Sequence, residues 1–454
     1  MTSSTPRPVR RALDDAALAD AEAALREANL RFTRSRPGEH EGRQPVHTVY
    51  GGAQLFAADT TPKLGAIALR ALDEFAPNAK TLGDALGIAG HPALERLYTR
   101  LADKLRGEPV EDYRVDFEDG YGNRPDSEED HHAGLVAREL SRGIRDGSLP
   151  AFIGLRVKPL TEELRQRSVR TLDLVLTSLA DSGGLPSGWI VTLPKVTVAE
   201  QVDYFVAVLR NLERSLGLGD HALTFEVMVE TPQIILDSDG RSLLPRLVDA
   251  GDGRITGAHF GTYDYTASCN ITAAYQRMQH PACEFAKQVM QVAFAGTGIW
   301  LSDGSTTVMP VPIHRAAAGQ ELSREQRAEN AAGVHSAWRM HFDDVRHSLA
   351  GGFYQGWDLH PAQLVSRYAA LYSFFLEGID AAGARLANFV NKAAQATLVG
   401  DVFDDAATGQ GLLNFFLRGI NSGAVTEEEA LAMTGLTADE FRGRSFVKIL
   451  KGRK

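Results

Sequence analysis

Acidic and basic side chains recur at the ends of short apolar segments along this chain. Three acids close one such segment, Asp116, Glu118 and Asp119, and the next two segments carry Arg156 with Lys158, and Lys195. Later segments end in Glu230, Asp264, Asp303, Asp358 and His360. Carboxylates that converge repel one another unless a cation lies among them. With no cysteine nearby, their oxygens suit Mg²⁺, or Mn²⁺ as the alternative, better than zinc.

Each of these residues also has a purely structural interpretation. Arg156 could pair with Glu118 across a rim, and Asp119 begins a loop rich in turn residues. His360 precedes a proline and could begin a helix. Lys195 could form a Schiff base, but neighbouring carboxylates would keep it charged. A single residue therefore does not decide between a structural ion-pair network and a reactive site.

The segments that carry these residues have the length and composition of β-strands. They are residues 46–52, 113–119, 151–157, 189–196, 223–230, 255–265, 298–303 and 353–360. Seven of the eight are followed by a helical pattern, as at 161–182, 197–216 and 321–349. Most strands follow one another at intervals of roughly 30 to 55 residues, which is typical of βα units. Eight such units predict an α/β fold, a closed (β/α)8 TIM barrel whose strand ends share one mouth. A doubly wound open sheet is the alternative fold.

The predicted barrel spans residues 46–382 and leaves a segment at each end. Residues 1–45 are predicted to form an N-terminal helical extension, with an alanine-rich helix from about Ala12 to Asn29. Residues 383–454 are predicted to form a C-terminal helical cap. Two capping boxes, Thr426 with Glu429 and Thr437 with Glu440, predict the start of a short helix each.

Composition excludes several classes of protein. The net charge of −10 over 454 residues includes no basic block, so nucleic acid and anionic membranes are poor partners. No apolar run approaches the roughly 18 residues of a membrane helix. The two cysteines, Cys269 and Cys283, have no CxxC spacing, which suits a reducing compartment. We therefore expect a cytoplasmic globular protein. The sequence leaves open whether it forms a homo-oligomer.

Taken in order, these segments resemble those of a known superfamily, the HpcH/HpaI aldolases, the citrate lyase β-subunits (CitE-like) and the malate synthases. VDFEDGYGNRP (115–125) is similar to the strand end that reads DFED or DLED in that superfamily. GLRVKP (154–159) resembles the strand of its substrate-binding arginine, and TLPKV (192–196) resembles its LPK strand. VMVETPQIILD (227–237) and GAHFGTYDYTAS (257–268) are similar to the strands that supply its two magnesium ligands. GWDLHPAQLV (356–365) resembles its final strand, with an HP pair.

The resemblance implies a role for each matching residue. Glu230 and Asp264 would be the metal ligands, and Arg156, Glu118 and Asp119 would be catalytic. Substrate binding would involve Arg156 again, together with Asp116, Lys195, Thr262 and His360. In the tail, DVFDDAATGQGLLNFFLRG (401–419) is similar to the malate synthase segment that carries the general base, here Asp405. The alternative for Asp405 is a helix N-cap.

The function implied by the resemblance is that of a magnesium-dependent carbon–carbon lyase of the aldolase type. Its substrate would be a 2-oxo acid such as pyruvate, oxaloacetate or glyoxylate, processed through a metal-stabilised enolate. Two alternatives stay open. One is Claisen chemistry on an acyl-CoA, as in malate synthase or citramalyl-CoA lyase. The other is phosphotransfer of the phosphoenolpyruvate/pyruvate type, for which the sequence contains no P-loop pattern. A non-enzymatic regulator on the same scaffold is disfavoured by the complete set of acids.

Overall fold

Eight parallel β-strands close into a barrel at the centre of the molecule. The computed structural model describes residues 18–40, 42–317, 319–391, 397–399, 402–404 and 406–453. The strands are β1 (His47–Gly52), β2 (Asp112–Asp116), β3 (Phe152–Arg156), β4 (Trp189–Leu193), β5 (Phe225–Val229), β6 (Ile255–Phe260), β7 (Trp300–Ser305) and β8 (Gln355–Asp358). Each pairs in parallel with the next, and β8 pairs with β1, so the sheet has no free edge. The predicted barrel is confirmed, and the open sheet is excluded.

The strands lie where the apolar segments predicted them, with one informative difference. Every residue of β2, β4 and β5 is buried, because helices cover the outer face of the barrel and side chains fill its interior. The segment 255–265 was expected to be one strand, but β6 ends at Phe260 and the chain turns into α10 (Thr262–Ser268). Asp264 therefore lies in the first turn of a helix.

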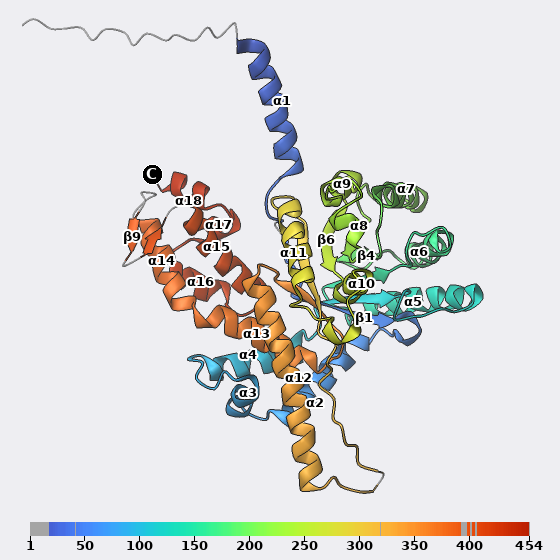
Figure 1. Cartoon of the computed structure of the whole chain (residues 1–454), viewed down its shortest axis with the longest axis vertical. Helices are drawn as coiled ribbons and strands as arrows, with labels where there is room; N and C mark the ends of the chain where they lie inside the picture. Colours follow the sequence, from blue (N-terminus) through green and yellow to red (C-terminus); the bar gives the residue numbers. More distant parts are fainter. Residues whose placement is uncertain are drawn as a thin grey trace, which may run out of the picture.

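Helices surround the barrel on its outer face (Figure 1). They are α2 (Thr60–Phe75), α3 (Ala79–Leu86), α4 (Leu94–Gly107), α5 (Asp126–Asp146), α6 (Arg165–Asp181), α7 (Ala199–Leu216), α8 (Pro232–Ile235), α9 (Leu244–Ala250), α10, α11 (Pro281–Phe294), α12 (Arg324–Ala350) and α13 (Gln363–Glu377). Their buried faces and the strands share one hydrophobic core. The predicted helices 161–182, 197–216 and 321–349 correspond to α6, α7 and α12.

Both ends of the chain add helices to the barrel, as predicted. The helix α1 (Ala19–Ser35) projects away from the body of the molecule (Figure 1). It ends later than the predicted Asn29, because the first helix-breaking residue after that point is Pro37.

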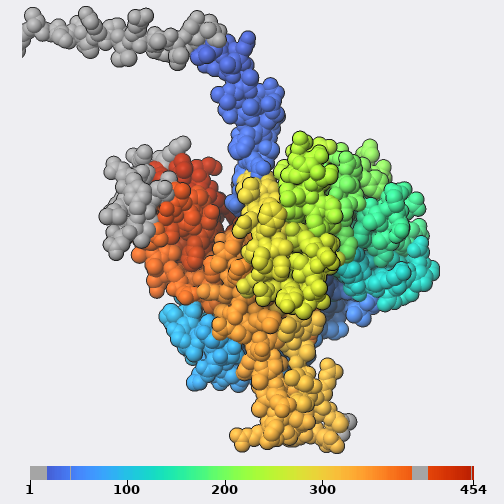
Figure 2. Space-filling view, viewed as in Figure 1, coloured from blue at the N-terminus to red at the C-terminus, as the bar shows by residue number. Residues whose placement is uncertain are grey.

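The C-terminal helices lie beside the barrel (Figure 2). The tail contains α14 (Ile379–Asn391), a short hairpin of β9 (Thr397–Val399) and β10 (Val402–Asp404), α15 (Ala406–Asn421), α16 (Glu427–Thr434), α17 (Ala438–Arg442) and α18 (Phe446–Gly452). Both predicted capping boxes form, at Thr426 and at Thr437. Among the described helices, none combines the length and the apolar character that crossing a bilayer requires.

Candidate active site

The C-terminal ends of neighbouring strands bring four predicted residues together around one lysine. The Lys195 ammonium, just beyond β4, forms an ion pair with Glu118 and lies 3.1 Å from Asp119 Oδ2 and 3.8 Å from Asp264 Oδ2. The backbone N–H of Lys195 donates to Glu230 Oε1 at 2.7 Å. Lys195 has a φ of 49°, a left-handed conformation that is uncommon for a residue other than glycine. Such backbone geometry clusters at functional sites, where the surroundings enforce it.

Arg156 is held rigidly at the end of β3. Asp116 accepts hydrogen bonds from Nε, at 2.8 Å, and from Nη2, while Nη1 lies 3.1 Å from Glu118 Oε2. The guanidinium also lies over two aromatic rings, 4.8 Å from the centroid of Tyr50 and 5.5 Å from that of Trp357. Asp116 therefore positions Arg156. Sequence reasoning missed Tyr50 and Trp357, although both are aromatic residues near the C-terminal ends of predicted strands.

Glu230 and Asp264 form a pair of carboxylates whose negative charge is poorly compensated by the protein's own cationic groups. Glu230 is only 1% exposed, and burial followed by repulsion from Asp264 raises its pKa to about 8. Gly261 permits this packing, since a Cβ there would lie 2.4 Å from Glu230 Oε2. No group of three or more His, Cys, Asp or Glu side chains is placed to hold a metal among the described residues. Glu230 and Asp264 would offer a cation two carboxylate groups, and carboxylate oxygens are ligands that Mg²⁺ prefers.

Lys195 and the two acids that pair with it, Glu118 and Asp119, differ in their proton affinity. Burial raises the pKa of Glu118. For Asp119, burial is outweighed by a hydrogen bond with Glu118 and by the charge of Lys195, which lower its pKa. Burial also opposes the charged form of Lys195, but Glu118 and Glu230 raise its pKa above the ordinary range. The lysine is therefore held as an ammonium, which argues against a Schiff-base role.

The remaining predicted site residues have separate environments. Thr262, at the start of α10, has a buried hydroxyl that finds no hydrogen-bond partner in the described structure. His360 Nδ1 accepts the backbone N–H of Ala362 at 3.2 Å, and burial lowers the pKa of its imidazole. Asp405 lies outside the described residues. The helix that follows it, α15, contacts the opposite end of the barrel, where Asn421 hydrogen-bonds the backbone of Gln44.

Two acids that were expected at the mouth face the surrounding helices instead. Asp303 binds Lys287 of α11 at 3.0 Å and accepts the Ser348 hydroxyl of α12. Asp358 pairs with Arg367 of α13 at 2.7 Å and with the imidazoles of His47 and His341. Successive strand residues point to opposite faces of a sheet, and these two point outward. The expectation that all strand-end acids converge is therefore wrong for this pair.

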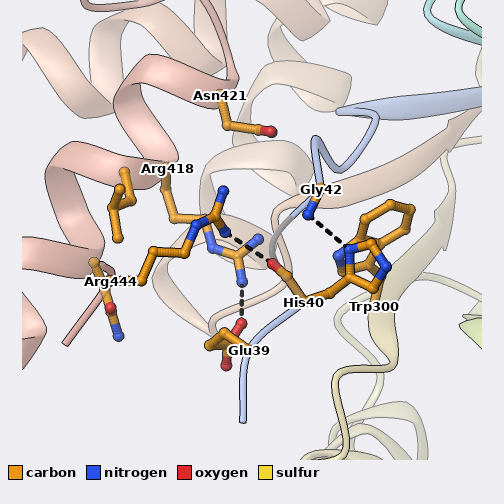
Figure 3. A pocket seen from close by; sticks show the side chains of 9 residues that line it. Glu39, His40, Gly42, Trp300, Arg418, Asn421 and Arg444 are labelled. Carbon is orange, nitrogen blue, oxygen red and sulfur yellow. Dashed lines mark hydrogen bonds and ion pairs between the residues drawn. The ribbon is translucent and has the colours of Figure 1, made fainter. Parts of the chain in front are cut away.

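A cavity lies at the other end of the barrel, between the start of β7 and α15 (Figure 3). In it Arg418 pairs with Glu39, and Arg444 donates to the His40 carbonyl at 2.8 Å. Its walls are formed by Glu39, His40, Gly42, Trp300, Asn414, Leu417, Arg418, Asn421 and Arg444. None of the predicted functional residues lines this cavity, so the mouth remains the candidate site.

Solved structures that are similar to this chain include a citrate lyase, a malate synthase and a CitE protein. A citrate lyase from Burkholderia xenovorans LB400 matches with 19% identity and a TM-score of 0.55, over 87% of this chain and 97% of that one. A malate synthase from Haloferax volcanii matches with 15% identity and a TM-score of 0.47, over 73% of this chain and 76% of that one. The CitE protein of Mycobacterium tuberculosis, solved with magnesium, acetoacetate and coenzyme A, matches with 12% identity and a TM-score of 0.47, over 83% and 98%. At such identities the first likeness establishes a shared fold and nothing further.

Sequence comparison assigns the chain to a family without assigning it an activity. No curated protein matches it. A family model described as a domain of unknown function, DUF6986, matches residues 25–449, which include the whole barrel and nearly all of the C-terminal helices. The chain is therefore a member of the DUF6986 family, folded as a (β/α)8 barrel.

Proposed function

We propose that the barrel mouth binds Mg²⁺ and that the protein is a carbon–carbon lyase acting on a 2-oxo acid. The observation that carries the proposal is the buried Glu230 carboxylate beside Asp264, at the same mouth as Arg156 and Lys195. Acids that repel one another favour a cation, and fixed cationic donors favour an anionic substrate. A 2-oxo acid supplies the carboxylate and the carbonyl oxygen that such a site recognises.

Glu230 and Asp264 would hold the magnesium ion. Both are oxygen ligands, and neither has a cysteine or histidine placed with it in a metal-binding group of the described chain. When bound, the ion supplies Lewis acidity toward the oxygens of the substrate. Removing the proton from Glu230 then becomes favourable, because the ion takes the place of the missing counter-charge.

Arg156 and Lys195 supply donors for the negative charge that develops on the 2-oxo acid fragment. When a carbon–carbon bond beside the 2-oxo group breaks, its electron pair moves toward the 2-oxo oxygen. Arg156 Nη1 is not held by Asp116; it pairs with Glu118 at 3.1 Å, and because this nitrogen carries two N–H groups it could also donate to that oxygen. Tyr50 and Trp357 cover the guanidinium and exclude water from it. Donors fixed in a dry site need no reorganisation during reaction.

Proton transfer requires a group whose proton affinity suits the step. Glu118 keeps its proton more readily than an exposed glutamate, which suits a donor to the carbon fragment. Asp405 is our proposal for the base. If it acts as the base, Asp405→Asn lowers turnover by roughly 100-fold or more while Mg²⁺ still binds. Asp404→Asn is the matched control and should change little. Normal turnover in Asp405→Asn would return the residue to a helix-capping role, since Asn caps about as well as Asp.

Titration calorimetry with a panel of 2-oxo acids tests the proposal. Pyruvate, oxaloacetate and glyoxylate are each titrated with and without Mg²⁺, and product formation is followed with and without acetyl-CoA. We expect binding of at least one 2-oxo acid only when Mg²⁺ is present. Product that forms only with acetyl-CoA would select the Claisen alternative. Equal affinity for a 2-oxo acid with and without Mg²⁺ would contradict the proposed site.

A further inference from the structure

The helix α1 has an apolar stripe that none of the residues described by the structure covers. All 17 of its residues are exposed, and it stands clear of the body of the molecule (Figure 2). Leu25 and Phe32 are 61% and 66% exposed. Most of the stability of a helix in a protein comes from packing of its apolar face rather than from intrinsic propensity. The exposed stripe therefore indicates a partner.

The spacing of the stripe is that of a coiled coil. Its apolar residues follow one another at alternating steps of three and four, namely Leu18, Ala21, Leu25, Ala28 and Phe32. This is the a and d pattern of a heptad repeat, which packs against a second helix. Large residues occupy one position and alanines the other, so a second copy of the same helix can approach closely by placing large side chains opposite small ones.

Charge along α1 favours an antiparallel partner of the same sequence. The first turns carry Asp20 and Glu22, and the last turns carry Arg31 and Arg34. In a parallel pair, acids would face acids and arginines would face arginines. In an antiparallel pair, the acidic half of each helix faces the basic half of the other. We infer that α1 pairs antiparallel with α1 of a second copy of this chain, forming a homodimer.

The barrel surface at the base of α1 extends this interface. Arg36, directly after the helix, donates to the carbonyl of Ala293 at 2.9 Å, which fixes the base of α1 to the end of α11. Beside that contact lies an apolar groove, lined by Ser242, Pro245, Phe285, Gln288, Val289, Val292 and Ala293. Phe285 and Val292 are 48% and 78% exposed. In an antiparallel pair the first turn of each helix lies near the base of the other, so Leu18 of one copy reaches the groove of its partner.

Sedimentation equilibrium of the full chain tests the pairing. We expect a dimer for the natural sequence and, for Leu25→Asp, a dimer weakened by at least about 100-fold. Leu30→Asp is the matched control: Leu30 is 53% exposed on the opposite face of the same helix, and its replacement should leave the dimer intact. Thermal unfolding of the barrel should be the same for both variants, because α1 contributes nothing to the core.

Charge reversal tests the orientation. Asp20→Arg with Glu22→Arg makes both halves basic and should weaken the dimer, most strongly at low salt. Adding Arg31→Glu with Arg34→Glu to the same chain restores opposite charges between the halves and should restore the dimer. A monomeric natural chain would overturn the inference. So would a dimer that survives Leu25→Asp, or a quadruple variant that stays as weak as the double one.

Discussion

Glu226 lies on β5 and Glu230 lies directly after the end of the same strand, yet their pKa values shift in opposite directions. Both are almost fully buried. Glu226, inside the barrel, lies 3.2 Å from Arg114 Nε and 2.7 Å from His259 Nε2, and these partners outweigh burial and lower its pKa. Glu230, at the mouth, has its pKa raised to about 8 by burial and by Asp264.

The difference supports different roles for the charged cluster in the barrel interior and the charged cluster at the mouth. In the interior, Asp112 pairs with Arg114 and accepts the Thr48 hydroxyl, although burial, together with repulsion from Glu226, raises its pKa. At the mouth, Asp116, Glu118, Asp119, Glu230 and Asp264 outnumber the two cations, Arg156 and Lys195. A balanced cluster stabilises the barrel. An unbalanced one costs stability, which supports our proposal that a cation binds there.

Removing the Glu230 carboxylate should have the largest effect on binding. In Glu230→Gln one of the two proposed metal ligands is lost, so we expect Mg²⁺ binding by calorimetry, and turnover with it, to disappear. Apo-protein unfolding near pH 7 should be almost unchanged, since the lost carboxylate was not well balanced. A marked fall in apo stability would instead assign Glu230 to a structural ion pair with Lys195 or Arg156.

The matching change in the interior should affect stability and not metal binding. Glu226→Gln leaves the buried guanidinium of Arg114 with less counter-charge, which lowers the free energy of unfolding by about 3 kcal/mol. Urea denaturation measures this loss. As a control, Glu27→Gln breaks only an exposed pair with Arg31 and should cost less than about 1 kcal/mol. Equal free energies of unfolding for Glu226→Gln and Glu230→Gln would contradict the distinction between the interior and the mouth.

Replacing Arg156 by lysine should have an intermediate effect on catalysis. The lysine keeps a positive charge but cannot hold Asp116 with two nitrogens and still present a third to substrate. We expect kcat to fall by at least about tenfold while Mg²⁺ binding persists. Arg170→Lys, on an exposed pair with Asp130, is the control and should retain full activity. Full activity in Arg156→Lys would show that only the positive field matters.

The smallest expected effect is on the pH dependence of apo stability. Glu230 has an ordinary pKa of 4.5 and one of about 8 in the folded state, so between these values the unfolded chain releases the proton first. Stability contributed by the protonated carboxyl is therefore complete below about pH 4.5 and is lost as the pH rises toward 8. The Tm of the natural apo-protein, measured as a difference from that of Glu230→Gln at the same pH, should fall by about 2 °C between pH 5 and pH 8. A difference that stays constant across this range would contradict the raised pKa.

Sequence patterns predicted the barrel and much of its mouth for a clear physical reason. A strand buried on both faces is a short apolar run, and the polar residue that ends it is conspicuous, as with Glu230 after β5. Sequence reasoning did not identify the interior network, because Arg114 and Glu226 lie within strands and the face to which each residue points depends on register. The same limit explains Asp303, which lies within β7, and Asp358, which ends β8, because both point toward the helices.

The sequence patterns also did not predict the helix start after Gly261 or the aromatic contacts of Arg156. The turn at Gly261 that places Asp264 on α10 depends on close packing against Glu230, a contact between separate strands. The stacking of Tyr50 and Trp357 on Arg156 joins β1 and β8 to β3 and becomes visible only when the barrel closes.

The isolation of α1 exposes it to cleavage by proteases. Arg26, Arg31 and Arg34 lie on an exposed helix that can open by breaking only its own hydrogen bonds, whereas cleavage in the barrel requires unfolding of the core. Trypsin should therefore trim the chain to a stable body that begins near Arg36. Because pairing of two copies would shield these arginines, dilution should accelerate the trimming, and the digestion rate becomes a direct measure of how much of the protein is paired.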